Sequence, residues 1–422
     1  MPTTAEREHA SGCVVAGGGP AGMMLGLLLA RAGVHVTVLE KHPDFLRDFR
    51  GDTVHASTLT LLDELGLGES FAALPHRPIQ SLRLSVQGVP VQMDLSRLPG
   101  AHKHIALVPQ WDFLELLARA AEQEPTFTLL RSSEVLGPLR DGSVVTGVRY
   151  RDADGAVHRL YAPLTVACDG RESTLRESMT SGRKTLAPKS FGAPMDVWWF
   201  RLPRTEDDPA GLAGAMGAGH VVAMIDRGDY FQCAFVIPKG ADRKLRAEGI
   251  ESLHRRVTAV VPWVADRIGT LTSFDEVKLL DVQLNRLPRW YADGLLCIGD
   301  AAHAMSPVGG VGINLAVADA VAAARLLAEP LLTGAVTTRH LRRVQTRRWL
   351  PTALVQGVQK QVHNRVIAVA VSDDSPADAP AAVKLVSRVS LLRRIIGYGI
   401  AIGPLPEHAP AFARRTRQSS RD

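Results

Sequence analysis

The chain has 422 residues, a formal net charge of +6, 46% hydrophobic residues and 22% charged residues, which is the composition of a globular protein with two or three packed units. No stretch reaches the ~18 apolar residues of a membrane-spanning helix, and the polar start lacks an apolar secretion core, so we expect a cytoplasmic protein. The 5% aromatic content argues against nucleic acid as a partner, and four scattered cysteines without a Cys-x-x-Cys pair argue against a metal site.

The first motif of the chain predicts a dinucleotide-binding unit. An apolar run over residues 12–17 is typical of a buried parallel strand, and Gly17, Gly19 and Gly22 follow it as G-x-G-x-x-G before a helix-like segment. A second strand pattern ends in Glu40, where a carboxylate can hold ribose hydroxyls. Such glycines let the backbone approach a pyrophosphate at the positive end of a helix. The motif alone fits FAD and NAD equally, and a lone glycine turn can also be purely structural.

Two later strand patterns each deliver an aspartate and a glycine to a turn. The run LTVACDG ends in Asp169-Gly170, and the run LLCIGD ends in Gly299-Asp300. Carboxylates and bare amides at the carboxyl edge of a sheet lie where open α/β folds bind ligands. A glycine-rich turn and an alanine-rich helix follow Asp300, and the N-terminus of that helix would face the part of a flavin that becomes negative on reduction.

Taken together, these motifs resemble the three signatures of the p-hydroxybenzoate hydroxylase-like flavoproteins, also called group A flavin monooxygenases. The matching segments are residues 17–22 (GGGPAG), 168–173 (CDGRES) and 299–316 (GDAAHAMSPVGGVGINLA), in the order and spacing of the family. One departure is Ala304, where many members carry a proline. The resemblance implies an α/β fold, with a Rossmann-like FAD-binding domain, a predominantly β substrate domain and C-terminal helices.

The resemblance also implies roles for individual residues. In that family the glycine turn holds the pyrophosphate, the acid matched by Glu40 holds the adenosine ribose, and the residues matched by Arg50 and Gln110 approach the ribityl chain and the pyrophosphate. The counterpart of Asp169 is linked to both FAD and NAD(P)H binding, and that of Asp300 contacts the ribityl chain. The expected FAD-binding residues are Gly17, Gly19, Pro20, Ala21, Gly22, Glu40, Lys41, Arg50, Gln110, Asp169, Gly299, Asp300, Pro307, Gly310, Val311, Gly312, Ile313 and Asn314, the last segment lying against the isoalloxazine.

A β-rich middle segment is expected to cover the flavin and hold the substrate. Runs at 195–202, 220–226 and 229–238 are β-branched and aromatic, which is typical of an antiparallel sheet. Candidates for its inner face are Trp198, Trp199, Met224, Phe231 and Gln232, although an aromatic side chain in a strand is more often plain core. Of these, Trp198, Met224 and Gln232 are the substrate candidates.

Histidines supply one further substrate candidate and no metal site. His55 lies near the Arg50 loop, which suggests a proton-transfer role as a hypothesis. His102 and His104 have metal-like spacing but no evident third ligand, so a structural explanation is favoured. The catalytic residues stay unassigned.

The signatures divide the chain into alternating segments. A C-terminal region of arginines and aliphatic residues is better explained as a helical cover of the flavin or substrate domain than as a membrane-surface contact. The expected segments are FAD-binding parts at 1–78, 98–182 and 277–335, substrate-domain strands at 79–97, a β-sheet substrate domain at 183–276, and a C-terminal helical region at 336–422.

The function that the resemblance implies is that of an FAD-dependent monooxygenase. NADH or NADPH would reduce FAD, O₂ would add to the flavin as a C4a-hydroperoxide, and one oxygen atom would hydroxylate or epoxidise a small aromatic or unsaturated organic substrate. Two alternatives stay open on the sequence: a dehydrogenase or reductase of the same fold, and a flavin-holding scaffold without redox turnover.

Overall fold

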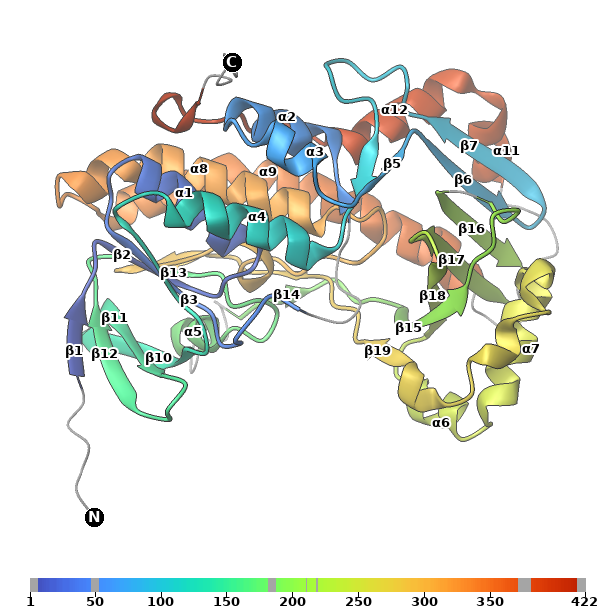
Figure 1. Cartoon of the computed structure of the whole chain (residues 1–422), viewed down its shortest axis with the longest axis horizontal. Helices are drawn as coiled ribbons and strands as arrows, with labels where there is room; N and C mark the ends of the chain where they lie inside the picture. Colours follow the sequence, from blue (N-terminus) through green and yellow to red (C-terminus); the bar gives the residue numbers. More distant parts are fainter. Residues whose placement is uncertain are drawn as a thin grey trace.

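The computed structural model describes residues 7–46, 53–180, 187–209, 211–217, 219–370 and 381–415. Figure 1 shows two bodies along the longest axis: a parallel sheet covered by long helices, and an antiparallel sheet flanked by α7 (Ile250–Val260). The chain passes between them several times, so each body is assembled from segments that are distant in sequence.

A six-stranded sheet forms the centre of the first body. Its order is β21-β22-β13-β2-β3-β9, and all neighbours are parallel except the antiparallel pair β21 and β22. All residues of β2 and β3 are buried, because layers cover both faces of the sheet, and this explains their continuous apolar runs. The bounds are β2 Cys13–Ala16, β3 Val36–Leu39, β9 Phe127–Leu130, β13 Thr165–Ala167, β21 Tyr291–Ala292 and β22 Leu295–Cys297.

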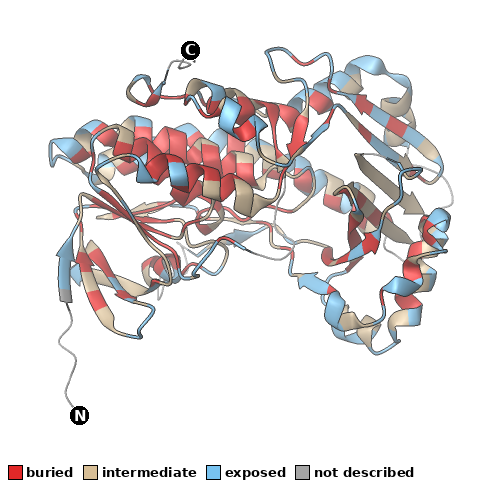
Figure 2. Cartoon of the chain, viewed as in Figure 1, coloured by how far each residue is buried: buried red, intermediate tan, exposed pale blue. Residues whose placement is uncertain are grey.

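Alternate residues of β2 point into two different cores. Cys13 and Val15 pack with a layer of helices, whereas Val14 and Ala16 pack with α5 and a second, four-stranded sheet. Figure 2 shows the helix layer as largely buried. The helices are α1 Pro20–Arg31, α4 Gln110–Glu122, α5 Thr174–Thr180, α8 Gly312–Leu332 and α9 Thr338–Val362; the four strands, in spatial order, are β1 Arg7–Ala10, β12 Val157–Tyr161, β11 Val144–Arg151 and β10 Glu134–Asp141.

The second body is built on a seven-stranded sheet in the order β19-β15-β18-β17-β16-β6-β7. All neighbours are antiparallel except β16 and β6, which run parallel. One face packs against α7 in a core of its own. The bounds are β6 Ser81–Val86, β7 Val89–Asp94, β15 Met195–Pro203, β16 Leu212–Gly217, β17 His220–Asp226, β18 Tyr230–Pro238 and β19 Lys278–Leu280.

The C-terminal part of the chain covers both bodies. Helices α11 (Ala381–Arg388) and α12 (Ser390–Ala401) contact β7, and the chain then returns along α8 and α9, where Arg325 Nη2 donates to His408 O at 2.5 Å. Among the helices that the structure describes, none has the length and apolar character to cross a membrane.

Short elements complete the described chain. They are β4 Thr53–Val54, α2 Ala56–Glu64, α3 Gly68–Ala72, β5 Arg77–Ile79, β8 Ile105–Leu107, β14 Lys189–Ser190, α6 Asp242–Arg246, β20 Asn285–Arg286, α10 Ala368–Ala370, the 3₁₀ turns Pro262–Val264, Ile268–Thr270, Phe274–Glu276, Gly299–Ala301 and Ala411–Ala413, and the π-helical turn His363–Ile367.

Candidate active site

The three sequence signatures meet at the carboxyl edge of the parallel sheet. The register pairs Ala16 with Ala167 and Ala167 with Cys297, so strands β2, β13 and β22 end in the same row. Backbone bonds continue this row, from Cys168 N to Ala16 O at 2.7 Å and from Ile298 N to Ala167 O at 3.1 Å. The structure therefore brings the Gly17, Asp169 and Asp300 turns together, although more than 280 residues separate the first turn from the last.

The glycine turn is shaped by close backbone approaches. Gly17 has a φ of +102°, and a Cβ there would lie 2.5 Å from Cys168 O. A Cβ on Gly22 would lie 1.9 Å from Gly17 O, whereas no described heavy atom lies within 4 Å of a Cβ built on Gly19. Pro20 is the first residue of α1, and Ala21 is buried beside Gly299. The amides at the start of α1 thus border open space, where a phosphate can approach.

Glu40 closes the glycine turn from the end of β3. Its Oε2 accepts a hydrogen bond from Gly18 N at 2.9 Å, and its Oε1 accepts one from His42 N at 3.0 Å. The side chain is buried, while the neighbouring Lys41 is exposed. These bonds hold the Glu40 carboxylate at the edge of the sheet where the ribose was expected.

Asp169 presents a largely buried carboxylate with unused acceptor capacity. Its Oδ2 accepts from Leu175 N at 3.4 Å, and its Oδ1 has no hydrogen-bond partner among the described residues. Burial raises the pKa of Asp169, because a charged carboxylate loses its hydration there. A buried acceptor of this kind is costly unless a donor reaches it.

The third turn places Asp300 next to the second. Asp300 Oδ2 accepts from Arg171 Nε at 3.1 Å, and Arg171 also donates to the Met305 carbonyl at 3.5 Å. Gly299 has a φ of +60°, and a Cβ there would lie 3.2 Å from Ala21 Cβ, so the turn packs directly on α1. Asp300 remains about one-third exposed and open to a further donor.

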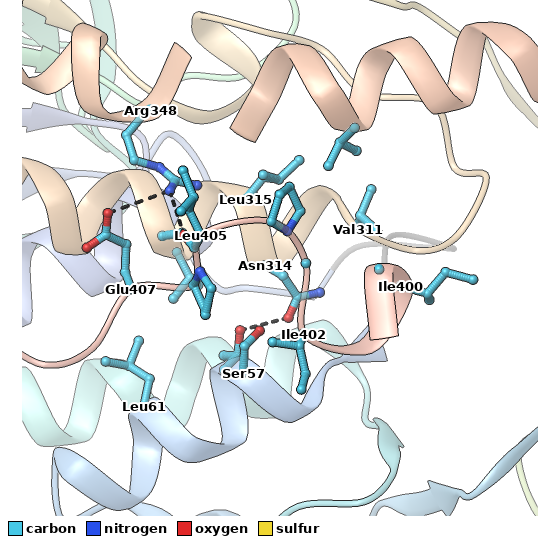
Figure 3. Close-up of a pocket in the computed structure, with 18 residues that line it drawn as sticks. Ser57, Leu61, Val311, Asn314, Leu315, Arg348, Ile400, Ile402, Leu405 and Glu407 are labelled. Carbon is cyan, nitrogen blue, oxygen red and sulfur yellow. Dashed lines mark hydrogen bonds and ion pairs between the residues drawn. The ribbon is translucent and has the colours of Figure 1, made fainter. Parts of the chain in front are cut away.

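The segment from Pro307 to Asn314 forms a tight turn into α8. Gly310 has a φ of +62°, and its carbonyl accepts from Thr53 Oγ1 at 2.8 Å. Asn314 Oδ1 accepts from His55 N at 3.0 Å and from Thr58 Oγ1 at 2.7 Å. Figure 3 shows Asn314 between α2 and the C-terminal segment, in a pocket that Leu405 and Glu407 also line.

The remaining residues of this turn are also placed. Val311 caps α8 and packs beside Met305, Gly312 is its first residue, and Ile313 is buried in the helix core. No described side chain caps the helix, so its first amides are open to a ligand. Gln110 is the first residue of α4, and Arg50 lies outside the described residues.

We call the turns at Gly17, Asp169 and Asp300 the first, second and third flavin turns. Two of the four substrate candidates lie away from them and from the 307–314 turn. Trp198 and Met224 are almost fully buried in the core between the second sheet and α7, where Trp198 Nε1 donates to Asp242 Oδ1 at 2.7 Å. Gln232 is on the opposite face, with its Oε1 accepting from Arg227 Nη2 at 3.0 Å. The plain-core explanation of Trp198 therefore fits its position better than substrate contact.

His55 is the candidate nearest to the flavin turns. Its Nδ1 lies 2.7 Å from Ile400 O, which can only accept, so Nδ1 carries the proton. Its Nε2 is buried without a partner in the part of the chain that is described. Burial lowers the pKa of His55 to about 4, although the bond to Ile400 O opposes the shift, so the ring is neutral at physiological pH.

Sequence reasoning named Trp199 as a candidate for the inner face of the second sheet but missed Met216 and Ala223, which face the 307–314 turn. Trp199, Met216 and Ala223 share a cluster with Val308, which lies within the Pro307–Asn314 turn. The available signal was the strand period of two, since Trp199 is opposite Ala234 in the register and Trp198 is opposite Phe235. That period gives two faces but does not say which one meets the flavin domain.

The residues at this edge fit an FAD molecule. Gly17 and Gly22 cannot carry a side chain, the space beside Gly19 is open, and the Asp169 carboxylate has an unpartnered buried oxygen. A pyrophosphate needs bare amides, and ribose and ribityl hydroxyls need carboxylate acceptors, which Glu40 and Asp300 provide. Fold and site together define an FAD-dependent oxidoreductase with the p-hydroxybenzoate hydroxylase-like fold, as the sequence predicted.

Comparisons with known proteins agree. The chain belongs to the FAD binding domain family, which matches residues 11–358. It is 36% identical over 402 residues, 94% of either chain, to the 6-methylpretetramide 4-monooxygenase of Streptomyces rimosus. It is 26% identical over 369 residues to the protoasukamycin 4-monooxygenase of Streptomyces nodosus subsp. asukaensis, covering 83% of this chain and 89% of that protein. The protein is an FAD-dependent monooxygenase, which confirms the main prediction rather than either alternative.

Solved structures show the same fold. PqsL of P. aeruginosa in complex with 2-aminobenzoylacetate aligns with a TM-score of 0.73 at 21% identity, over 87% of this chain and 99% of that one. The OxyS anhydrotetracycline hydroxylase of Streptomyces rimosus aligns with a TM-score of 0.72 at 23% identity, over 96% of this chain and 79% of that one.

Proposed function

We propose that this monooxygenase hydroxylates a planar, fused-ring aromatic substrate, with NADH or NADPH as the electron donor and O₂ as the oxygen source. The observation that carries the proposal is a row of small residues on the sheet face beside the 307–314 turn. Gly214, Ala223 and Ala234 are opposite one another on β16, β17 and β18. A row without bulky side chains forms a flat surface across adjacent strands.

Larger side chains bound this row at both ends. Trp199 is opposite Ala234 at one end, and Leu84 is opposite Gly214 at the other, where Leu84 Cδ2 would lie 2.7 Å from a Cβ on Gly214. Val308 belongs to the same apolar cluster as Trp199 and Ala223, which brings the 307–314 turn to this face. A flat aromatic ring system matches such a surface, because it can lie on the alanines and meet the ring of Trp199.

The FAD would lie along the carboxyl edge described above. In this proposal the amides of Gly17–Gly22 hold the pyrophosphate, Glu40 the ribose, Asp300 the ribityl chain, and Pro307–Asn314 the isoalloxazine. The bound flavin supplies electron transfer from the nicotinamide and the activation of O₂. The open amides at the start of α8 would stabilise negative charge on a flavin bound there.

The relatives support an aromatic substrate of this kind. The relative at 36% identity is named for 6-methylpretetramide, and the structurally similar OxyS is named for anhydrotetracycline. Because the chain matches 94% of the first protein's length, the similarity includes the substrate domain as well as the flavin domain.

Substrate-stimulated oxidation of the nicotinamide tests the proposal. The holoenzyme would be mixed with NADH or NADPH and either anhydrotetracycline as a fused-ring probe or 4-hydroxybenzoate as a single-ring probe, under ¹⁸O₂. We expect the fused-ring probe to accelerate oxidation and to gain one ¹⁸O atom. Acceleration by the single-ring probe alone, or oxidation that no fused-ring phenol changes, contradicts the proposed substrate class.

The Ala223→Phe variant tests the surface itself. A phenyl ring at 223 would stand in the middle of the row, where Ala223 is partly exposed. We expect the KM for a fused-ring substrate to rise by about tenfold or more, because extra bulk forced into a packed contact costs on the order of 1–3 kcal/mol. FAD affinity should stay at the wild-type value, which serves as the internal control.

A further inference from the structure

A buried carboxylate behind the third flavin turn is unexplained by the site described so far. Asp319 lies on α8 with no exposed surface, and its Oδ2 accepts from Gly299 N at 3.1 Å and from His303 Nε2 at 2.5 Å. Its Oδ1 accepts from Arg348 Nε at 3.0 Å. Three donors thus converge on one carboxylate, and two of them belong to the turn that carries Asp300.

The turn from Gly299 to His303 is closed by a backbone hydrogen bond between its two ends. The backbone N of His303 donates to Gly299 O at 2.9 Å, while the His303 side chain donates to Asp319. The His303 ring also packs against the Trp290 indole, with the ring centres 4.8 Å apart. Asp300 lies inside this loop, so its direction depends on how Gly299 and His303 are held.

The same carboxylate is connected to the C-terminal segment. Arg348 is buried on α9, and its Nη1 lies 3.6 Å from Glu407 Oε1 and donates to Leu405 O at 3.4 Å. Glu407 in turn accepts two bonds from Arg347, at 2.7 and 2.9 Å. Figure 3 shows Arg348 and Glu407 side by side at the end of the pocket that Asn314 lines.

Neighbouring charges explain how the Asp319 side chain remains a carboxylate when it is buried. Burial alone would raise the pKa of Asp319, but His303 and Arg348 outweigh it and hold the pKa below its usual value. Apolar side chains of similar volume would often replace such a buried network without loss of stability.

We propose that Asp319 is the positioning residue of the flavin-binding Asp300 turn, and that Arg348 and Glu407 extend this support to the C-terminal segment. Asp319 does not touch the cofactor in this account; it fixes the Gly299 amide and the His303 ring, and through them the Asp300 carboxylate. The inference rests on FAD binding and is independent of the substrate class proposed above.

The Asp319→Asn variant tests this role through FAD affinity. Asparagine keeps the shape but has one acceptor oxygen where aspartate has two, so it cannot accept both from Arg348 and from Gly299 and His303, and we expect the Kd for FAD to rise by about 10- to 100-fold. Asp226→Asn is the matched control, because Asp226 is equally buried and pairs with Arg77 and Arg204 at 3.4 Å in the second body. The control should lose stability but keep its Kd for FAD within about twofold.

The comparison of the two variants decides the outcome. A Kd for FAD that is unchanged in Asp319→Asn, or raised equally in both variants, overturns the positioning role. If Asp319→Asn does not fold, Glu407→Gln at the other end of the network takes its place. A rise in Kd of about threefold or more in Glu407→Gln supports the proposal, and an unchanged Kd in that variant contradicts it.

Discussion

The Asp300 carboxylate accepts a hydrogen bond from Arg171 Nε at 3.1 Å, so an ion pair joins the second and third flavin turns. These residues are 129 positions apart and follow different strands of the same parallel sheet. Because both side chains are partly exposed, the pair contributes little to the folding free energy. We expect the main effect of this ion pair to be on the orientation of the Asp300 carboxylate that the cofactor would contact.

Replacement of Asp300 separates cofactor binding from stability. In Asp300→Ala the proposed ribityl acceptor is lost, so the Kd for FAD should rise by about 10- to 100-fold, while the free energy of unfolding of the apoprotein changes by less than about 1 kcal/mol. Quenching of flavin fluorescence measures the first quantity and urea unfolding the second. Equal FAD binding by the variant and the wild type would remove Asp300 from the site.

Two glycine substitutions in the same turn should affect different quantities: one the stability of the apoprotein, the other its affinity for FAD. Gly22→Ala places a Cβ 1.9 Å from Gly17 O, so the apoprotein should lose about 1–3 kcal/mol of stability. Gly19→Ala meets no described atom within 4 Å, so the apoprotein should keep its stability and bind FAD more weakly, because the methyl group takes space that the pyrophosphate needs. Thermal unfolding with and without FAD distinguishes them; weak binding without destabilisation in both variants would contradict the turn geometry.

Adjacent tryptophans in β15 should give different phenotypes. Trp198→Ala removes a fully buried ring and its bond to Asp242, so it should cost about 3–5 kcal/mol of stability. Trp199→Ala lies on the flavin-facing side and should mainly raise the KM for the aromatic substrate. Urea unfolding and steady-state kinetics of both variants check this, and a larger kinetic effect at Trp198 would reverse the assignment of the two faces.

His55 should make the fold sensitive to acid. Because its pKa is lowered to about 4, the unfolded chain binds the proton first, and stability is lost as the pH falls from about 6.5 towards 4. Between about pH 7 and pH 5 this amounts to about 2 kcal/mol, which His55→Asn should remove from the pH dependence. Urea unfolding at both pH values measures it. An unchanged difference in His55→Asn would show that other groups cause the acid sensitivity.

The sequence predicted well that the Gly17, Asp169 and Asp300 turns meet at one edge of the parallel sheet, because its signals are local. A strand pattern followed by a glycine or an Asp-Gly pair predicts both the strand and the turn that ends it. Parallel strands then place their carboxyl ends at the same edge of the sheet. The expected runs at 195–202, 220–226 and 229–238 also appear as β15, β17 and β18. The glycine-rich β16, by contrast, carried no clear strand pattern.

The missing parts depend on contacts between distant residues. The second sheet is covered by α7 on one face and approached by the 307–314 turn on the other, so neither face of β15 is marked by polarity, and the sequence left both Trp198 and Trp199 as candidates for the inner face. The network from His303 through Asp319 and Arg348 to Glu407 joins four segments of the chain, so no local sequence pattern predicts it.

Calorimetric titration of the apoprotein with FAD tests the central claim most directly. A single FAD held along the three turns predicts binding of one FAD per chain, with affinity reduced separately by Gly19→Ala at the pyrophosphate end and by Asp300→Ala at the ribityl end. An apoprotein that takes up no FAD, or whose affinity neither substitution changes, would contradict the account.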